Sequence, residues 1–589
     1  MRILGIHCDT PHDAGVAVCE DGRISFALGE ERLTRVKQDG AVPARSLAEL
    51  LRFTGLGWGD FDAVCYTGTP PLQRLRDAGA YSRASYVMRR AGRWDGTPTF
   101  AVLRRPHNTL GIKDYRLHRR KERALLALLT EYAGPIERVS HHSAHATAAY
   151  YAGGIPGSAV LVVEGVGDLK TTSWFRPTPG GLVEHDLQYW PDSVGRYYEC
   201  VTKLLGFHIV RHGGKITGLA AYGDPDAVYE KVRPLLWNEG PGMRVAPEVY
   251  QLIREYTRRG KRMPARFEGD RREDVAAAFQ RRLEEVVVAW TEGVLKRSGA
   301  SALTLAGGVF ANVKLNQRLH ALPGVEHLMV HPAMSDAGLA VGAALWGWER
   351  ATLAEGRVPK PIPLPNAFLG PEYSEGEMVA ALSAAGLRFE RPGDIHETIA
   401  EALAQGRVVA RFTGRLEYGP RALGNRSILY RADDPSVNGW LNRRLARTEF
   451  MPFAPAVAWE WRDRLFRDVA GAEGAAQYMT VTFGCTPEMR ERGAAAVHVD
   501  GTARPQLVRR EANPALYATL TAYGRRTGFP CVVNTSFNLH EEPIVCTPGD
   551  AVRAFLQADL DLLAMGPFVA ARPERVVGTV RLDRRREVE

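Results

Sequence analysis

Hydrophobic and polar positions near the N-terminus follow the short period of a strand meander. Residues 2–7 form an apolar run, the polar turn "CDTPHD" follows, and residues 15–19 form a second run before the turn "EDG" and a third strand. The pattern recurs in "SAVLVVEGVGDLKTTSWFRPTPGGLVEH", where strands alternate with a Gly-rich and a Pro-Gly turn. Helical patterns follow both copies. The repeat predicts a duplicated α/β domain.

Glycine turns and prolines extend this picture along the chain. Duplicated domains of the actin-like ATPase kind hold a nucleotide between their halves, with turns that wrap the phosphates. The stretch "SALTLAGGVFANVKLNQRL" predicts a buried strand that ends at Gly307 and Gly308, with a helix N-terminus behind it that suits phosphate or adenosine. Prolines then concentrate in "VPKPIPLPNAFLGPEYS". We expect a first domain over residues 1–357, an extended linker over 358–372 and a second α/β domain over 373–589.

Three histidines lie within five residues in "HHSAHATAAYYAGG". On a helix, His141 and His145 project from one face and can close on one metal ion, whereas His142 points elsewhere. The alanines favour a packed helix, and a capped, solvated helix start is the alternative. No glutamate follows the first histidine, which excludes the H-E-x-x-H protease pattern. A metal site here needs carboxylates from other segments.

Two acidic residues are candidates to complete the histidine pair. Glu164 lies in the turn "EGVGD", and Asp336 lies where "SDAGLAVGAAL" predicts a helix start, so it is also a candidate N-terminal helix carboxylate. Two histidines with one or two carboxylates suit Fe(II), Mn(II) or Zn(II). His12, at the tip of the first turn, is a candidate general base, with Asp13 beside it as a turn-capping residue.

The second domain carries a dense arginine motif in "RFTGRLEYGPRALGNRSIL". Its arginines alternate with glycine and proline, which places the guanidinium groups on tight turns that suit bidentate capture of phosphate or carboxylate. Arg504 and the cluster "NTSFN" add a further cation and polar groups. An ordinary arginine-rich surface is the alternative.

Composition and charge narrow the class of protein. The chain has 589 residues, 45% hydrophobic and 24% charged, without a run near the ~18 apolar residues of a membrane span. Its seven cysteines are scattered, so we expect reduced thiols in a cytoplasmic protein. The net charge of +9 gathers partly in an arginine-rich insertion over residues 72–128. We interpret it as a solvated helical segment, because no aromatic-interleaved RNA-binding motif accompanies it.

Taken together, these stretches resemble the NodU/CmcH carbamoyltransferases of nodulation-factor and antibiotic biosynthesis. The matching stretches, in family order, are "HDAGVAV", "EERLTRVKQDG", "HHSAHA", "EGVGD", "GGKITGLAAYGDP", "AGGVFAN", "SDAGLAVGAAL", "EYGPRALGNRSIL", "MPFAPAV" and "NTSFNLHEEPIVCTPGDA". The resemblance implies an N-terminal ASKHA domain, the actin-like ATPase class, joined to a C-terminal YrdC-like α/β domain.

The resemblance also implies an activity, that of an ATP-dependent O-carbamoyltransferase. The C-terminal domain would make carbamoyl-adenylate from carbamoyl phosphate and ATP, with Mg(II) as an optional companion ion. The N-terminal domain would transfer the carbamoyl group to a hydroxyl at a metal site, with His12 as the base and Fe(II) as the expected ion. The implied metal ligands are His141, His145, Glu164 and Asp336.

The resemblance further assigns two sets of binding residues. In the N-terminal domain, the nucleotide or carbamoyl-adenylate contacts would be Lys37, Gln38, Gly165, Gly167, Lys215, Gly218, Gly307, Gly308 and Asn312. In the C-terminal domain, the carbamoyl phosphate and ATP contacts would be Arg415, Arg421, Arg426, Arg447, Arg504, Asn534 and Ser536.

Two departures from the family pattern bear on these sets. The family usually has Asp at the position of Glu164. The segment "LARTEFMPFAP" is one residue shorter than usual, and it offers Ala446, Arg447 and Met451 where the family has cations. Loss of a phosphate-facing cation weakens binding unless Arg447 or a neighbouring arginine replaces it.

The acceptor is expected to be a hydroxyl, or less typically an amine, of a small secondary metabolite or sugar. We expect no membrane and no nucleic-acid partner, and a homodimer is one assembly left open. A tRNA-modifying enzyme and a non-catalytic nucleotide-binding scaffold are the alternatives. The first would leave its adduct on tRNA, and the second would bind ATP without releasing pyrophosphate.

Overall fold

The computed structural model describes residues 1–68, 112–445 and 451–572, and within it the side chains from residue 119 onward in the helix that begins at Ile112. Arg447 and residues 72–111 of the arginine-rich insertion lie outside the described residues. The helical part of that insertion is confirmed from Ile112 to Leu128, with Arg119 and Arg120 exposed.

The first meander builds a five-stranded sheet with the order β3-β2-β1-β4-β5. β1 pairs antiparallel with β2 and parallel with β4. The strands are β1 (Arg2–His7), β2 (Gly15–Glu20), β3 (Arg23–Gly29), β4 (Ala63–Thr67) and β5 (Ile136–Val139), and the helices are α1 (Glu31–Thr34), α2 (Ala44–Thr54) and α5 (Ile112–Leu128).

The second meander builds a sheet of the same topology, ordered β12-β11-β6-β7-β8. Its first strand again pairs antiparallel with the second and parallel with the fourth. The duplicated actin-like α/β domain is therefore confirmed. Its strands are β6 (Ala159–Gly167), β7 (Lys170–Thr178), β8 (Gly181–Tyr189), β11 (Ala302–Ala306) and β12 (His327–Val330), with a hairpin of β9 (Leu236–Glu239) and β10 (Gly242–Val245). The helices of this half are α7 (Val194–Leu204), α8 (Gly213–Ala220), α9 (Tyr229–Val232), α10 (Glu248–Arg258), α11 (Arg272–Ser298) and α12 (Val313–His320).

Two further helices, α6 (His141–Gly153) and α13 (Leu339–Ala354), pack tightly against each other. Small residues make the close approach possible: a Cβ on Gly342 would lie 1.8 Å from the carbonyl oxygen of Ala144. On the other side of α13, a Cβ on Gly5 of β1 would lie 2.0 Å from the carbonyl oxygen of Ala340. This packing fixes α6 and α13 relative to the first sheet.

The C-terminal part is an α/β unit on an eight-stranded mixed sheet, ordered β13-β22-β21-β14-β15-β20-β16-β19. The strands of this sheet are β13 (Phe389–Glu390), β14 (Val409–Phe412), β15 (Arg426–Arg431), β16 (Ala454–Ala458), β19 (Gln506–Val508), β20 (Cys531–Ser536), β21 (Leu562–Met565) and β22 (Phe568–Ala571). The helices are α14 (Glu375–Ala384), α15 (Ile395–Ala404), α16 (Val437–Arg444), α17 (Arg462–Leu465), α18 (Glu473–Gln477), α19 (Pro487–Arg492), α20 (Pro514–Thr527) and α21 (Pro548–Gln557). A small antiparallel sheet of β17 (Phe483–Gly484) and β18 (Thr502–Ala503) lies beside them.

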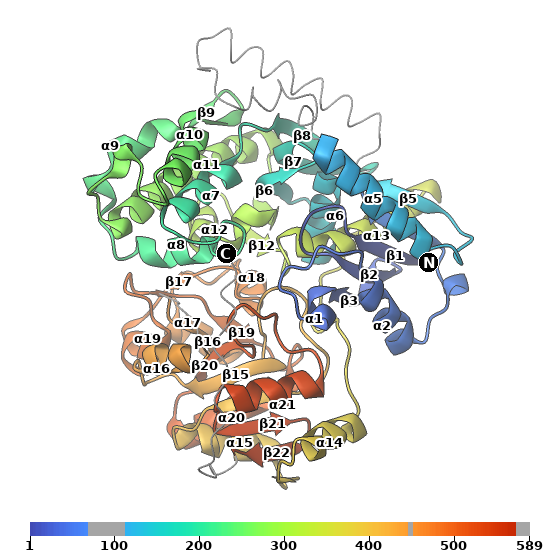
Figure 1. The fold of residues 1–589 in the computed structure, drawn as a ribbon, viewed down its shortest axis with the longest axis vertical. Coiled ribbons are helices and arrows are strands. Elements are labelled where there is room, and N and C mark those ends of the chain that lie inside the picture. The colour runs from blue at the N-terminus through green and yellow to red at the C-terminus, as the bar shows by residue number, and fades with distance from the viewer. Residues whose placement is uncertain (69–111, 446–450, 573–589) are drawn as a thin grey trace.

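The C-terminal unit lies directly against the N-terminal one (Figure 1). One large hydrophobic cluster joins Phe310 and Leu315 of the N-terminal unit to Phe466 and Phe483 of the C-terminal one. The proline-rich segment between the units is extended and packs on the end of α6, where Ile362 N donates to Tyr151 O at 2.8 Å. The two units therefore share buried surface.

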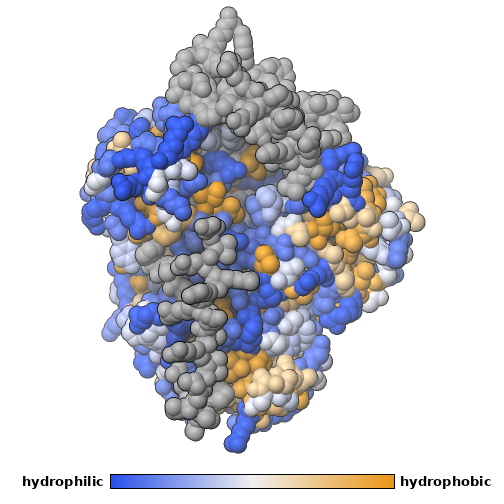
Figure 2. Space-filling view, viewed as in Figure 1, coloured by the Kyte–Doolittle hydropathy of each residue, from blue (hydrophilic) through white to orange (hydrophobic). Residues whose placement is uncertain are grey.

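The surface seen in Figure 2 is mostly hydrophilic, with hydrophobic side chains gathered in separate patches. No helix among the described residues is both long and apolar enough to span a membrane. All seven cysteines are free and buried.

Candidate functional site

The helix α6 carries the histidine pair. Ser140 caps its N-terminus by accepting a hydrogen bond from Ser143 N, and Gly154 ends it in a left-handed conformation with φ 74°. The rings of His141 and His145 are 0% and 1% exposed. The solvated helix start is therefore wrong, because the cap is present but the histidines face the interior.

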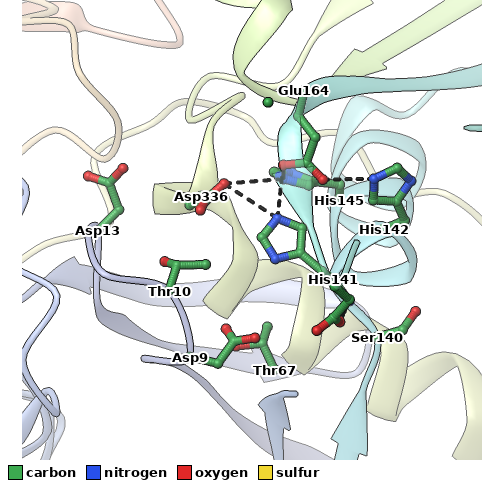
Figure 3. A network of polar contacts seen from close by, with 12 residues as sticks. Asp9, Thr10, Asp13, Thr67, Ser140, His141, His142, His145, Glu164 and Asp336 are labelled. Carbon is green, nitrogen blue, oxygen red and sulfur yellow. Dashed lines mark hydrogen bonds and ion pairs between the residues drawn. The ribbon is translucent and has the colours of Figure 1, made fainter. Parts of the chain in front are cut away.

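Two carboxylates from other segments meet these rings (Figure 3). Glu164 comes from β6, and Asp336 comes from the 3-10 turn Asp336–Gly338 that leads into α13. His141 Nε2 lies 3.1 Å from Glu164 Oε2 and 3.4 Å from Asp336 Oδ1. His145 Nε2 lies 3.7 and 3.6 Å from the same two oxygens.

These four side chains fit a divalent metal ion. Their ligand atoms all lie within 4.8 Å of one another. Ligand atoms held about 2.1 Å from one ion lie about 3 to 3.5 Å apart, close to the contacts seen here. His145 Nε2 is buried and has no hydrogen-bond partner among the described residues, and its distances to the carboxylates exceed those of a hydrogen bond.

The electrostatics of the group agree with this fit. Burial favours the neutral form of a carboxyl, yet the imidazole of His141 outweighs it and holds the pKa of Glu164 and Asp336 well below the ordinary range. The same two carboxylates raise the pKa of His141 and His145, although burial of the rings lowers it, so protons on the imidazoles balance the two negative charges. A divalent cation bound here would take the place of those protons.

His12 lies beside the group, on the turn between β1 and β2. Its Nδ1 is 3.0 Å from Asp13 Oδ2 and 3.7 Å from Asp336 Oδ2. Burial lowers the pKa of His12, but the hydrogen bond to Asp13 and the charge of Asp336 outweigh it and raise the pKa to about 9. The neutral base expected from the sequence thus competes, in this structure, with an imidazolium stabilised by two carboxylates.

A buried network of polar side chains holds this turn in place, and it was not predicted from the sequence. His7 Nδ1 lies 2.7 Å from Thr67 Oγ1, and its Nε2 lies 2.9 Å from Thr10 Oγ1. Thr67 in turn donates to Asp9 Oδ1 at 2.7 Å. On the outer side, Lys121 of α5 donates to the carbonyl oxygen of Thr10. The sequence signal for this network is the pair of polar residues Asp9 and Thr10, which follow a buried strand.

His142 also belongs to the site. As expected, it points away from the ion-sized group, but it is fully buried, and its Nε2 lies 2.7 Å from Glu164 Oε1. Its Nδ1 lies 2.6 Å from Ser173 Oγ of β7. No role for this ring was predicted from the sequence.

The predicted glycine turns converge at the ends of two neighbouring strands, because β6 pairs in parallel with β11. A Cβ on Gly167 would lie 2.3 Å from the ring of His141, and a Cβ on Gly307, at φ 101°, would lie 2.3 Å from Val163 O. Gly308 has open space around it. Asn312 caps α12 and pairs with Gln280 in the interior. Gly165 follows Glu164 on β6 and packs against Gly195 of α7.

The remaining residues of the predicted N-terminal set gather around the start of α8. Arg211 donates to Lys37 O at 3.0 Å and to Gln38 Oε1 at 3.3 Å. Lys215 is buried, with its ammonium 5.8 Å from the ring centroid of Phe207. Gly218 is covered by Met451, whose Cγ would lie 2.3 Å from an added Cβ.

A buried carboxylate organises the C-terminal arginine loop. Glu417 Oε1 accepts hydrogen bonds from the backbone N–H groups of Leu423, Asn425 and Arg426 at 2.7–3.0 Å. Glu417 is 2% exposed. The sequence analysis missed this residue, which lies inside the quoted motif.

Two of the predicted anion-binding arginines face backbone carbonyls. Arg426 is fully buried, donates to Thr413 O at 2.6 Å and Gly414 O at 3.0 Å, and stacks over the ring of Phe412. Arg415 donates to Gly370 O and, across to the N-terminal unit, to Ser25 O, both at 2.9 Å. In this structure both side chains act as donors that hold their own loops, and their assignment to anion binding stays a prediction.

The other C-terminal residues lie around the same sheet. Arg421 is half-buried on the loop before β15, and Ser536 ends β20 opposite Ser427. Asn534 is buried and donates to Gln506 Oε1 at 2.7 Å.

Arg504 faces a cavity between the two units. The cavity has a volume of about 270 Å³ and is lined by Arg504, Met451, Lys314 and Arg281 together with Thr217 of α8. Met451 adds an apolar wall, and the acidic residues Glu284 and Asp500 line the same cavity beside the three cations.

Comparison with known proteins identifies the family. The family model of the carbamoyltransferase N-terminus matches residues 2–345, and that of the carbamoyltransferase C-terminus matches residues 400–572. Nodulation protein NolNO of Sinorhizobium fredii is 31% identical, with 95% of this chain and 78% of that protein covered. Nodulation protein NolO of Bradyrhizobium diazoefficiens is 34% identical, with 74% and 79% covered.

Similarity to solved structures is weaker. Full-length HypF in the phosphate- and nucleotide-bound form is 11% identical with a TM-score of 0.31, over 59% of this chain and 46% of that one. The two carbamoyltransferase family models, in contrast, together span most of the chain. The chain belongs to the carbamoyltransferase family, and the protein is a transferase.

Proposed function

We propose that the protein is an ATP-dependent O-carbamoyltransferase with two reaction sites. In the C-terminal unit, hydrolysis of carbamoyl phosphate would give carbamate and phosphate. The carbamate oxygen would then attack the α-phosphorus of ATP, forming carbamoyl-adenylate and releasing pyrophosphate. In the N-terminal unit, an acceptor hydroxyl would attack the carbonyl carbon, and the C–O bond to AMP would break.

The observation that carries this proposal is the convergence of His141, His145, Glu164 and Asp336 in a buried group beside His12, in a chain of this family. An ion held there would act as a Lewis acid toward charge on the adenylate phosphate. The donor set suits Fe(II), with Mn(II) or Zn(II) as alternatives. Neutral His12 would take the proton of the hydroxyl, and Asp13 would hold the ring toward the site.

The proposed acceptor is a small secondary metabolite or sugar, and the proposed nucleotide contacts lie where β6 and β11 end and where α8 begins. The turns at Gly167 and Gly307 bring backbone close to the histidine helix, and Gly308 has open space above it. A cytoplasmic location belongs to the same proposal.

Carbamoyl phosphate-dependent release of pyrophosphate from ATP tests the donor chemistry. The purified protein should release pyrophosphate only when both compounds are present, and Arg421→Ala should abolish this release. Arg388→Ala, at an exposed position of the same unit, is the matched control and should leave it unchanged. Release that is independent of carbamoyl phosphate would contradict the proposed donor.

A further inference from the structure

His142 is a buried imidazole between the predicted metal centre and strand β7, and the proposed reaction gives it no task. Its ring is 0% exposed, and the Glu164 carboxylate lies between it and Asp336 (Figure 3). A buried ring of this kind needs partners for both nitrogens. Both of its nitrogens have close polar neighbours.

The ring has a polar contact at each nitrogen. Nε2 lies 2.7 Å from Glu164 Oε1, at ion-pair distance, although the geometry of this contact leaves neither atom with a hydrogen bond among the described residues. An ionised carboxylate can only accept, so the contact favours the N–H at Nε2. Nδ1 lies 2.6 Å from Ser173 Oγ, whose hydroxyl can donate to it. Ser173 is itself fully buried and lies on β7, the strand paired with β6, which carries Glu164.

The two oxygens of the Glu164 carboxylate therefore face different partners. Oε1 faces His142, while Oε2 faces His141 at 3.1 Å and His145 at 3.7 Å. His142 itself is outside the group whose ligand atoms lie within 4.8 Å of one another. His142 therefore lies where it can orient the Glu164 carboxylate without itself binding the ion.

The length of the Glu164 side chain makes such a restraint useful. A glutamate has one more rotatable bond than an aspartate, so its carboxylate has more orientations to lose when it is fixed. We propose that His142, backed by Ser173, is a positioning residue that holds Glu164 with Oε2 directed into the metal centre. This inference rests on the proposed function, because it assigns a role toward the metal that the proposed function invokes.

Binding of Co(II) to the purified full-length protein tests the inference, with chelator competition for affinity and the visible absorption spectrum for ligand geometry. His142→Leu removes the donor at similar volume, and His142→Gln returns an amide N–H. Residues that orient metal ligands typically change metal affinity about 10–100-fold. We expect His142→Leu to lose affinity in this range with an altered spectrum, His142→Gln to recover most of both, and Ser173→Ala to lose less.

The outcomes separate this inference from the proposed function. If His142→Leu binds Co(II) with wild-type affinity and spectrum, the inference is overturned while the metal centre stands. If Leu and Gln variants lose Co(II) equally and both melt at a lower temperature, His142 only fills the core, and the inference is again overturned. If the wild-type protein takes up no Co(II), the metal centre of the proposed function fails, and this inference falls with it.

Discussion

At the scale of single residues, the candidate centre consists of buried charges that compensate one another. Glu164 and Asp336 stay ionised in the interior because His141 and His145 face them, and a bound cation would replace the protons that the carboxylates hold on these rings. His12 is part of the same set of charges, because its Nδ1 lies 3.7 Å from Asp336 Oδ2. Changes at these positions should therefore alter metal binding and proton transfer before they alter the fold.

Removal of one imidazole tests the metal group. His145→Ala deletes one of four donor atoms, and we expect the purified protein to lose most of its divalent metal, from near one ion per chain to well below it. Elemental analysis of anaerobically purified, chelator-free protein measures this. His327→Ala, at an exposed histidine of β12, is the control and should keep its metal. Equal metal content in both variants would contradict the assignment.

The pH dependence of carbamoyl transfer tests the role of Asp13. Burial lowers the pKa of His12, but its hydrogen bond to Asp13 and the charge of Asp336 outweigh burial and raise the pKa to about 9. Loss of the Asp13 charge should therefore lower the pKa of His12. In Asp13→Asn the neutral base is then present at lower pH, and the rising limb of kcat/KM should move to lower pH. Asparagine tolerates the φ of 62° at this position. A rising limb at the wild-type pH would show that His12 is not the titrating group.

At the scale of elements, the α6–α13 contact positions the candidate centre. α6 carries both histidines, and α13 follows directly on the turn that carries Asp336. Their backbones approach at Ala144 and Gly342, where no side chain fits. The distance between these helices therefore sets the distance between the imidazoles and Asp336.

Gly342→Ala should separate the two helices. The added Cβ would lie 1.8 Å from Ala144 O, and overpacking of this kind costs about 1–3 kcal/mol. We expect a lower thermal midpoint together with weaker metal binding. Gly376→Ala, in the exposed first turns of α14, is the matched control with room for a Cβ, and it should keep or raise the midpoint. Weak metal binding without a drop in the midpoint would contradict the packing argument.

The sequence predicted the elements better than the contacts among polar groups. Both strand meanders and the histidine helix follow from period-2 and period-3.6 patterns, which are local. The contact of His142 with Glu164 depends on α6 packing against β6, so no local pattern contains it. The burial of Arg426 has a similar cause, because a guanidinium on a glycine turn can face a ligand or the carbonyls of its own loop.

At the scale of the whole molecule, the two units are joined by buried apolar surface and by charges. Arg211 and His212, at the start of α8, both contact Glu541 of the C-terminal unit, at 2.8 and 3.1 Å. Arg211 also holds the Lys37–Gln38 segment. This ion cluster therefore connects both halves of the N-terminal unit to the C-terminal one.

Glu541→Gln should weaken that connection in a pH-dependent way. Burial raises the pKa of Glu541, but hydrogen bonds from Arg211 and His212 outweigh it and lower the pKa to about 2. Because the pKa of Glu541 is lower in the folded protein than its unfolded value near 4.5, the ionised carboxylate stabilises the fold above that pH. This stabilisation is lost as the pH falls toward 2. Because the carboxylate is about one-third exposed, we expect less than about 1 kcal/mol. The difference in thermal midpoint from wild type should be steady above pH 5 and shrink below it, and a difference independent of pH would contradict the ion-pair origin.

In the proposed reaction, donor activation and carbamoyl transfer occur at separate sites. The most direct measurement of this separation follows carbon-14 from carbamoyl phosphate, together with pyrophosphate, in reactions of wild type and His12→Asn. The acceptor source is a deproteinised extract of cells that lack the protein. The wild type should release pyrophosphate and transfer the label to a new product. His12→Asn should also release pyrophosphate, but its label should remain in carbamoyl-adenylate. The reason is that a positioned base contributes about 10²–10⁴-fold to transfer. Loss of both steps in His12→Asn, or wild-type labelling by that variant, would contradict the account.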